Sequence, residues 1–311
     1  MIMSIEPTAR ERTVVFVVAP GVHLLDLAGP AQVFSTAQDL GAGYDLRYVG
    51  DTEQVASHQG PTLGVGRRWP ALTPRDFVIV PGWRVGAGSA PMALDSGTVQ
   101  RIADHHAGGG RVVSICAGAF ALAAAGLLDG RRATTHHDVQ AELADRFPAV
   151  HVVDDVLFVS DQRVYTSAGI ASGIDLALHL VAADHGPALA ARVARSMVVY
   201  GRRNGSSPQD SAMLRHRDHL ADVVHRAQDV IDQRYAESLP LAWLADHVGV
   251  SPRTLTRLFH EATGTTPLRY HQELRTERVV QLVDQGWTRE AAARDVGFTD
   301  ARMVRRLYHA R

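Results

Sequence analysis

The sequence predicts two units of different fold class, an α/β unit followed by an all-α unit with two helix-turn-helix motifs. Over roughly the first two hundred residues, short apolar runs alternate with helical stretches, which indicates a parallel sheet with helices on both faces. Over roughly the last seventy residues, one helix-turn-helix pattern occurs twice. The length of 311 residues also suits about two domains.

The elements of the first unit follow from its periodicity. We expect strands at the apolar runs Thr13–Ala19, Tyr44–Val49, Phe77–Val80, Arg111–Cys116 and Ala133–His136. Helical patterns lie between them, over Leu24–Gln38, Thr98–His106 and Ala119–Leu128. A hairpin, Val156–Val159 with Val164–Ser167, and two helices, Ser172–Asp184 and Pro187–Tyr200, complete the unit, which we place at residues 10–200.

A polar segment separates the two units. Gly201–Ser211 reads GRRNGSSPQDS and is rich in Gly, Ser and Pro, a composition typical of a flexible tether. We therefore expect a linker over residues 201–217 and the all-α unit over residues 218–311.

The repeated pattern of the all-α unit spans Leu241–Phe259 and Arg289–Tyr308. Each copy has an alanine-rich segment, then Val-Gly, then a polar cap position and a second helix that carries arginines. The glycine permits the sharp turn between two helices, and an alanine in each copy, Ala245 or Ala293, lets them approach closely. Two copies joined by an amphipathic helix over Pro267–Gln285 are a strong signal for DNA binding, whereas one copy would be weak.

The second helix of each copy is the candidate reading helix. An apolar pair four residues apart marks its buried side, Leu255 with Phe259 and Val304 with Tyr308. The candidate DNA-binding residues are on the opposite side: Arg253, Thr256, Arg257, Arg302, Arg305 and Arg306. Residues 251–311 hold eleven arginines against seven acidic residues, so positive charge gathers where phosphate would lie.

The all-α unit resembles the DNA-binding domain of the AraC family of transcription regulators, from Leu220 to Arg311. The resemblance includes the join GTTPLRYHQELRTERVVQLV. It implies that the two reading helices enter successive major grooves of double-stranded operator DNA, about one turn (~34 Å) apart. The family usually continues past the second reading helix. Since this sequence ends at Arg311, we expect the second reading helix to be held less firmly than the first.

The first unit contains one cysteine in a setting typical of a reactive residue. Its strand ends at Cys116, and Ala117-Gly118-Ala119 allows an immediate turn into a helix, the geometry that exposes a nucleophile at the edge of a sheet. A helix N-terminus there would favour the thiolate. Asp26 follows the first strand, and Gly82 follows another and offers a backbone N–H.

This unit resembles the ThiJ/PfpI superfamily, with a glutamine-amidotransferase-like, flavodoxin-like fold, over Thr13 to Tyr200. In that superfamily an acid lies beside the elbow cysteine and a histidine follows the next strand, which implies Asp26, Cys116 and His136 here. The candidate ligand pocket therefore comprises Asp26, Gly82, Cys116, Ala117 and His136. The two resemblances in this order match the GlxA-like branch of AraC-type regulators, which implies a first unit that dimerises and senses a small-molecule effector.

The alternative is a cysteine-dependent enzyme. Isonitrile hydratases of this superfamily share the D-x-x-G-P segment, here Asp26–Pro30, but have a threonine where this sequence has Ala117. Trp83 also interrupts their glycine pair. An amidase or peptidase would need a base beside Cys116, and a third interpretation is that Cys116 is simply a small buried residue at a turn. We expect no enzyme, no catalytic residues and no cofactor.

Composition limits the remaining classes. Net charge is −1 and one cysteine excludes an intramolecular disulfide. Neither a signal peptide nor a membrane-length apolar run occurs, so we expect a cytoplasmic protein without membrane association. Sixteen histidines come without a cysteine cluster or HExxH motif, so we expect no metal site. The expected partners are operator DNA, an effector, a second copy of the chain and, for an activator, RNA polymerase.

Overall fold

The computed structural model describes residues 12–84, 93–199, 203–209, 216–284 and 286–298. The chain divides into two compact units, residues 1–206 and 207–311, each of which is described by itself. None of the described helices combines the length and apolarity that a membrane crossing requires.

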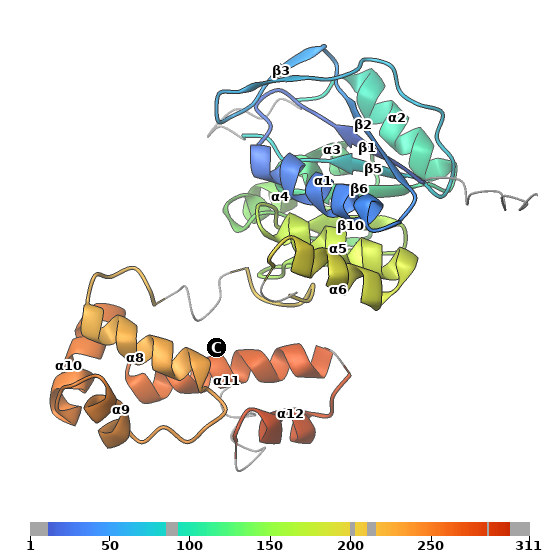
Figure 1. Cartoon of the computed structure of the whole chain (residues 1–311). Helices are drawn as coiled ribbons and strands as arrows, with labels where there is room; N and C mark the ends of the chain where they lie inside the picture. Colours follow the sequence, from blue (N-terminus) through green and yellow to red (C-terminus); the bar gives the residue numbers. More distant parts are fainter. Residues whose placement is uncertain (1–11, 85–92, 200–202, 210–215, 285, 299–311) are drawn as a thin grey trace, which may run out of the picture. The chain divides into compact units, whose positions relative to one another are not determined.

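A six-stranded sheet forms the centre of the first unit (Figure 1). Its order is β2 (Tyr44–Val49), β1 (Arg12–Val17), β5 (Phe77–Val80), β6 (Arg111–Ile115), β10 (Val164–Ser167) and β9 (Phe158–Asp161). All neighbours pair in parallel except β9, which is antiparallel to β10. Counted along the chain, the parallel strands have the order 2-1-3-4-5 of flavodoxin-like folds, so the predicted fold class is confirmed.

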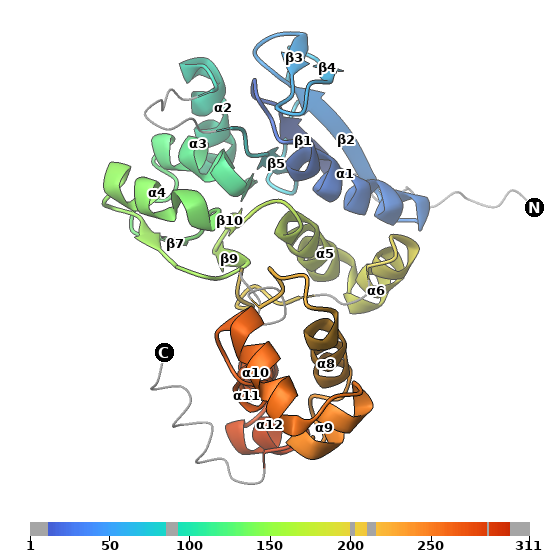
Figure 2. The same ribbon diagram turned by 90° about the vertical axis from the view of Figure 1, so that its left-hand side faces the viewer.

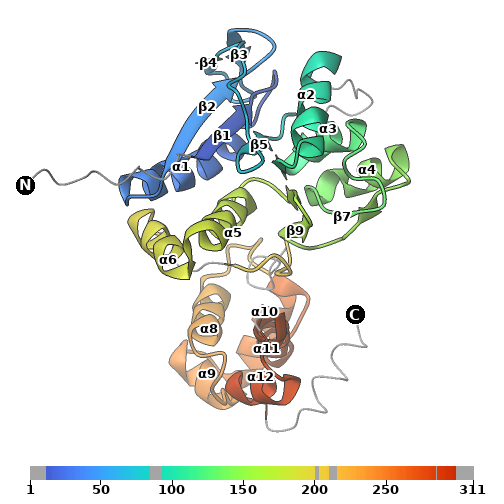
Figure 3. The same ribbon diagram turned by 90° about the vertical axis from the view of Figure 1, so that its right-hand side faces the viewer.

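Helices cover both faces of this sheet, which is why β5 is buried along its whole length. On one face lie α1 (Leu24–Asp39), α5 (Ser172–His185) and α6 (Pro187–Ser196), and on the other lie α2 (Ser96–Ala107) and α3 (Ala119–Ala124) (Figures 2 and 3). Smaller elements surround this frame: the hairpin β3 (Gln54–Ala56) with β4 (Thr62–Gly64), the pair β7 (Arg132–Ala133) with β8 (His151–Val152), the 3-10 turns η1 (Cys116–Gly118) and η2 (His137–Val139), and α4 (Gln140–Arg146).

Three predicted elements of the first unit differ from the structure, and one of them is the helix expected over Pro187–Tyr200, which ends at Ser196. The strand expected over Ala133–His136 is wrong, because β7 ends at Ala133 and pairs only with β8. Hydrogen bonds between backbone and side chain replace the strand pairing there. The Thr134 N–H donates to Thr166 Oγ1 (2.9 Å), and Thr135 Oγ1 donates to the Cys116 carbonyl (2.8 Å). The helix expected to reach Leu128 ends at Ala124, shortly before Gly126 adopts φ 70°.

The start of the predicted linker is bound to the first unit. The Arg203 guanidinium donates to Asp175 Oδ2 (3.0 and 2.7 Å), and the Gly205 carbonyl accepts from the N–H groups of Leu157 and Phe158. Asp175 is 3% exposed, and a carboxylate so buried needs a cation partner. These residues are therefore held in place and are not free as a flexible tether would be.

The described part of the second unit is helical: α8 (Asp222–Gln233), α9 (Leu241–His247), α10 (Pro252–Thr263), α11 (Pro267–Asp284) and α12 (Arg289–Asp295) (Figure 1). Leu255 and Phe259 of α10 are fully buried against α8, α9 and Tyr270 of α11. A second cluster joins α11 to α12 through Val279, Leu282, Ala293 and Phe298. The two helix-turn-helix copies therefore have separate cores along one shared helix.

The two turn glycines give a matched test of this packing. Gly249 and Gly297 have φ values of 76° and 84°, but a Cβ at Gly297 would lie 2.0 Å from the Ala236 carbonyl oxygen, whereas one at Gly249 would meet nothing within 4 Å. We expect Gly249→Ala to destabilise the second unit by about 1 kcal/mol through backbone strain alone. Gly297→Ala should cost a further ~1–3 kcal/mol, since the α8–α9 connection must move. Urea unfolding of both variants checks this, and equal losses would contradict it.

Candidate functional site

Three strand ends meet at one edge of the sheet. Asp26 lies in the first turn of α1 after β1, Gly82 follows β5, and Cys116 follows β6. The strand order reverses between β1 and β5, and ligands of open α/β sheets bind at the carboxyl ends of strands beside such a reversal. The structure thus brings together Asp26, Gly82, Cys116 and Ala117, as the sequence predicts.

Two glycines make this close approach sterically allowed. A Cβ at Gly82 would lie 2.6 Å from Asp26 Oδ2 and 2.7 Å from Cys116 Cβ. A Cβ at Gly169, in the loop after β10, would lie 2.2 Å from Cys116 Cβ, and Gly169 also has φ 89°. Any side chain at either position would displace the acid or the cysteine, so the carboxylate and the thiol lie close together in a tightly packed setting.

Asp26 is fully buried, and its pKa is raised. Its Oδ1 accepts a hydrogen bond of 2.5 Å from the Ile170 N–H, while Oδ2 faces Cys116 and Gly82. Among the described residues, Oδ2 has no hydrogen bond of good geometry, although the thiol is near enough to stabilise its charge in part. Burial raises the pKa of Asp26 to about 6, and the Ile170 N–H and the thiol oppose that rise. The carboxyl group is therefore mostly ionised at neutral pH.

Cys116 has the strained backbone of a nucleophile elbow but not the charge state of an activated thiol. Its φ is 54°, a left-handed value uncommon for a non-glycine residue. Burial and then the Asp26 carboxylate raise the pKa of the thiol, and the Ala117 N–H offsets only part of this. The helix start favours a thiolate, as the sequence predicts, but desolvation outweighs the dipole of one short 3-10 turn.

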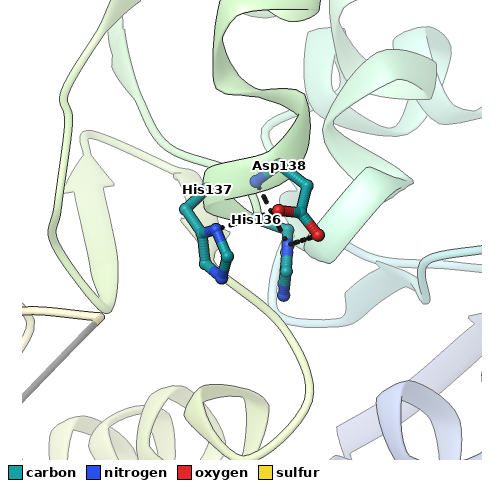
Figure 4. A group of neighbouring side chains, drawn as sticks. All are labelled: His136, His137 and Asp138. Carbon is teal, nitrogen blue, oxygen red and sulfur yellow. Dashed lines mark hydrogen bonds and ion pairs between the residues drawn. The ribbon is translucent and has the colours of Figure 1, made fainter. Parts of the chain in front are cut away.

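His136 has its hydrogen bond and ion pair at the start of η2. It caps η2, where its Nδ1 accepts from the Asp138 N–H (3.3 Å) and lies 3.4 Å from Asp138 Oδ2. The His137 ring is 4.2 Å away, centroid to centroid (Figure 4). Burial and His137 lower the pKa of His136, so its ring is neutral at neutral pH. Its recorded polar contacts within the described residues go to Asp138 and not to Cys116.

Further histidines near His136 were missed in the sequence. His23 occupies the N-cap position of α1, and its ring lies 4.8 Å from the ring of His58. The backbone N–H of His58 donates to the Val22 carbonyl. Burial, His58 and His136 lower the pKa of His23. Each of these histidines follows the end of a strand, and that position, rather than any motif, is the signal that would have identified them.

The candidate reading helix α10 is built as predicted. Ser251 accepts from the Thr254 N–H (3.2 Å), Pro252 occupies the first turn, and Gly264 ends the helix in a left-handed conformation. Arg253 and Arg257 are exposed, and Arg257 forms an ion pair with Glu261 (2.9 Å). Thr256 is half-buried and donates to the Pro252 carbonyl (3.0 Å). Arg302, Arg305 and Arg306 lie outside the described residues. The prediction that their helix is held less firmly also concerns residues outside the described part of the chain.

Comparisons with known proteins agree with both units. Residues 12–183 match the DJ-1/PfpI family and residues 244–311 match a helix-turn-helix domain. The chain belongs to the DJ-1/PfpI family. Within it, this chain combines the DJ-1/PfpI domain with a helix-turn-helix domain of AraC type, so the predicted GlxA-like architecture is confirmed.

Named relatives include both regulators and an enzyme. The chain is 33% identical over 180 residues to the HTH-type transcriptional regulator GbdR of Pseudomonas aeruginosa (57% of this chain, 48% of that protein). It is 33% identical over 179 residues to the regulator GlxA of Rhizobium meliloti (56% and 54%). It is 36% identical over 168 residues to isonitrile hydratase of Pseudomonas putida (53% and 68%). The matches thus span about half the length of these regulators.

A solved structure shows the same fold. A ThiJ/PfpI family protein from Pseudomonas syringae aligns with a TM-score of 0.53 and 25% sequence identity, over 74% of this chain and 90% of that one.

The raised pKa of Asp26 predicts a pH-dependent stability. Because the folded-state pKa of about 6 exceeds the ordinary 3.8, the contribution of protonated Asp26 to stability is fully present below pH ~4 and is lost as pH rises through ~6. Asp26→Asn keeps an acceptor for the Ile170 N–H and removes the buried charge. Its free energy of unfolding relative to the parent chain should therefore increase by about 1–2 kcal/mol between pH 5 and 7.5.

Chemical unfolding across this pH range measures the effect, followed by circular dichroism. Asp145→Asn, at an exposed carboxyl group on α4, controls for the general loss of one charge. A difference between Asp26→Asn and the parent chain that does not change with pH would contradict the assignment.

Proposed function

We propose that the protein is a sequence-specific DNA-binding transcription regulator whose first unit senses a small-molecule effector and dimerises. One observation carries this proposal: a complete helix-turn-helix presents two exposed arginines, Arg253 and Arg257, on the reading helix α10. The confirmed domain pair and the regulators among the relatives support it. We propose a cytoplasmic location, as a protein acting on operator DNA requires, and contact with RNA polymerase if the protein activates transcription.

The linker helix α11 supports a fixed spacing between the two readers. Its Tyr270 hydroxyl donates to Asp232 on α8 (2.6 Å), and its Arg275 guanidinium donates to the carbonyls of Tyr235 (2.6 Å) and Glu237 (2.7 Å). These bonds join α11 to α8 and to the α8–α9 connection. A rigid α11 would hold two reading helices at one separation, as successive major grooves demand.

The first unit is better suited to binding than to catalysis. The thiol beside the ionised Asp26 is held in its protonated form, and the nearest expected base, His136, has its contacts elsewhere. Ala117 also lacks the hydroxyl group that the resemblance to isonitrile hydratases leads one to expect. We propose that Asp26, Gly82, Cys116, Ala117 and His136 contribute to an effector pocket without turnover.

Selection of duplexes from random DNA by the full chain tests the main proposal, and light scattering tests the dimer. Arg257→Ala should then weaken binding to a selected site by ~1–3 kcal/mol and relax specificity at one base pair if Arg257 contacts a base edge. If it contacts only phosphate, the loss should be uniform across sequences and the salt slope should fall by about one.

Arg146→Ala provides the matched control, because Arg146 forms the same i,i+4 ion pair, with Glu142, on α4 of the first unit. Glu261→Gln should strengthen binding slightly, since it frees Arg257 and removes a carboxylate from the DNA-facing side. Unchanged affinity in Arg257→Ala would exclude this residue from the interface.

Cys116→Ser separates sensing from DNA binding. The sulfur lies in the first unit, so we expect the folded, dimeric variant to bind the selected DNA with unchanged affinity. Loss of DNA binding would refute this division of labour. Turnover of an isonitrile or a peptide by the parent chain, abolished in Cys116→Ser, would instead establish the enzyme alternative.

A further inference from the structure

Three consecutive residues, His136, His137 and Asp138, bring potential metal ligands together at the start of α4 (Figure 4). One ligand atom from each lies within 4.8 Å of the others. The His136 Nδ1 is 3.4 Å from Asp138 Oδ2, and the His137 Nδ1 is 3.1 Å from Asp138 Oδ1. No other group of three such residues converges in the part of the chain that the structure describes.

The separations match those around a transition-metal ion. Zinc binds imidazole nitrogen and carboxylate oxygen at about 2.0–2.2 Å, so neighbouring ligands of a tetrahedral site lie about 3.3 Å apart. The two nitrogen–oxygen distances of 3.1 and 3.4 Å lie on either side of that value. The two distances involve different oxygens of the carboxylate, and one ligand atom from each of the three residues lies within 4.8 Å of the others. Binding of one ion by all three would therefore draw the side chains closer together.

The hydrogen bonding of His136 shows which ring nitrogen carries its lone pair. Nδ1 accepts from the Asp138 N–H (3.3 Å), so the proton lies on Nε2. The same Nδ1 is 3.4 Å from an Asp138 carboxylate oxygen. Because Nδ1 has one lone pair, coordination of an ion by this atom would replace the hydrogen bond that caps η2.

We propose that His136, His137 and Asp138 bind a divalent first-row transition metal ion, with zinc, nickel and copper as the class that two imidazoles and one carboxylate select. Magnesium and calcium prefer oxygen ligands and fit the set poorly. The His137 and Asp138 side chains are 60% and 72% exposed, so water or an effector would complete the coordination. This site goes beyond the proposed function and does not depend on DNA binding.

The location connects such an ion to the pocket. Thr135 precedes the three ligands and donates to the Cys116 carbonyl (2.8 Å), and the Asp138 charge acts on the thiol. A divalent cation at Asp138 would neutralise that charge. Metal occupancy would therefore change the electrostatics beside Cys116 and Asp26 without direct contact.

Equilibrium dialysis of the full, untagged chain against Zn²⁺ tests the proposal. We expect one saturable equivalent and a raised thermal midpoint, because the ion binds only the folded arrangement. His137→Gln and Asp138→Asn should each weaken zinc binding at least tenfold, since even outer-sphere changes cost about 10–100-fold. Both residues are exposed, so the variants should fold, and circular dichroism verifies that they do.

His151→Gln, at an exposed histidine of β8 in the same unit, is the matched control and should bind zinc like the parent chain. Electron paramagnetic resonance with Cu²⁺ should show two imidazole nitrogens in the parent chain and one in His137→Gln. Equal zinc affinity in His137→Gln and the parent chain would overturn the site. Loss of zinc in Cys116→Ser, with His137→Gln unaffected, would assign the ion to the thiol and would equally overturn it.

Discussion

The arrangement at the carboxyl edge of the sheet depends on one buried interaction, the bond from the Ile170 N–H to the Asp26 carboxylate. It joins the first turn of α1 to the loop after β10, across the ends of β5 and β6. Gly82 and Gly169 leave space for nothing larger than hydrogen beside Asp26 and Cys116. The acid, the cysteine and the two glycine loops are therefore interdependent, and the left-handed backbone of Cys116 persists because its surroundings fix it.

The same interaction decides what chemistry the edge permits. An ionised carboxylate beside a sulfur atom keeps the thiol protonated, because two adjacent negative charges in a site with little water are costly. The elbow geometry alone would indicate a nucleophile, as it does in the enzymes of this fold. Here burial and the Asp26 carboxylate raise the pKa of the thiol, so the charges around the cysteine bear on the function of the domain as well as its fold does.

Much of this could be predicted from the sequence. Tyr44–Val49 and Phe77–Val80 are strands with the predicted bounds. For Phe77–Val80 the reason is that a continuous apolar run between turn signals indicates burial on both faces. The N-cap of α10 and its buried pair, Leu255 and Phe259, could also be predicted, because both depend on residues close together in the sequence. The local strand-turn-helix pattern indicated Cys116, but its grouping with Asp26 and Gly82 required the resemblance, since no local pattern shows that three strand ends meet. The thiol's charge state could not be predicted, because it depends on desolvation by residues distant in the sequence.

The residues around His136 were missed for a related reason. A strand is expected over Ala133–His136, and a strand continued to His137 would point the two rings to opposite faces. The chain instead leaves the ladder after Ala133, because the Thr134 N–H donates to Thr166 Oγ1 and Thr135 Oγ1 donates to the Cys116 carbonyl. The 3-10 turn that follows brings both rings to the same carboxylate. The end of the strand at Ala133 thus creates the one place in the described residues where three such ligands converge, and Thr135 links it to the Cys116 backbone.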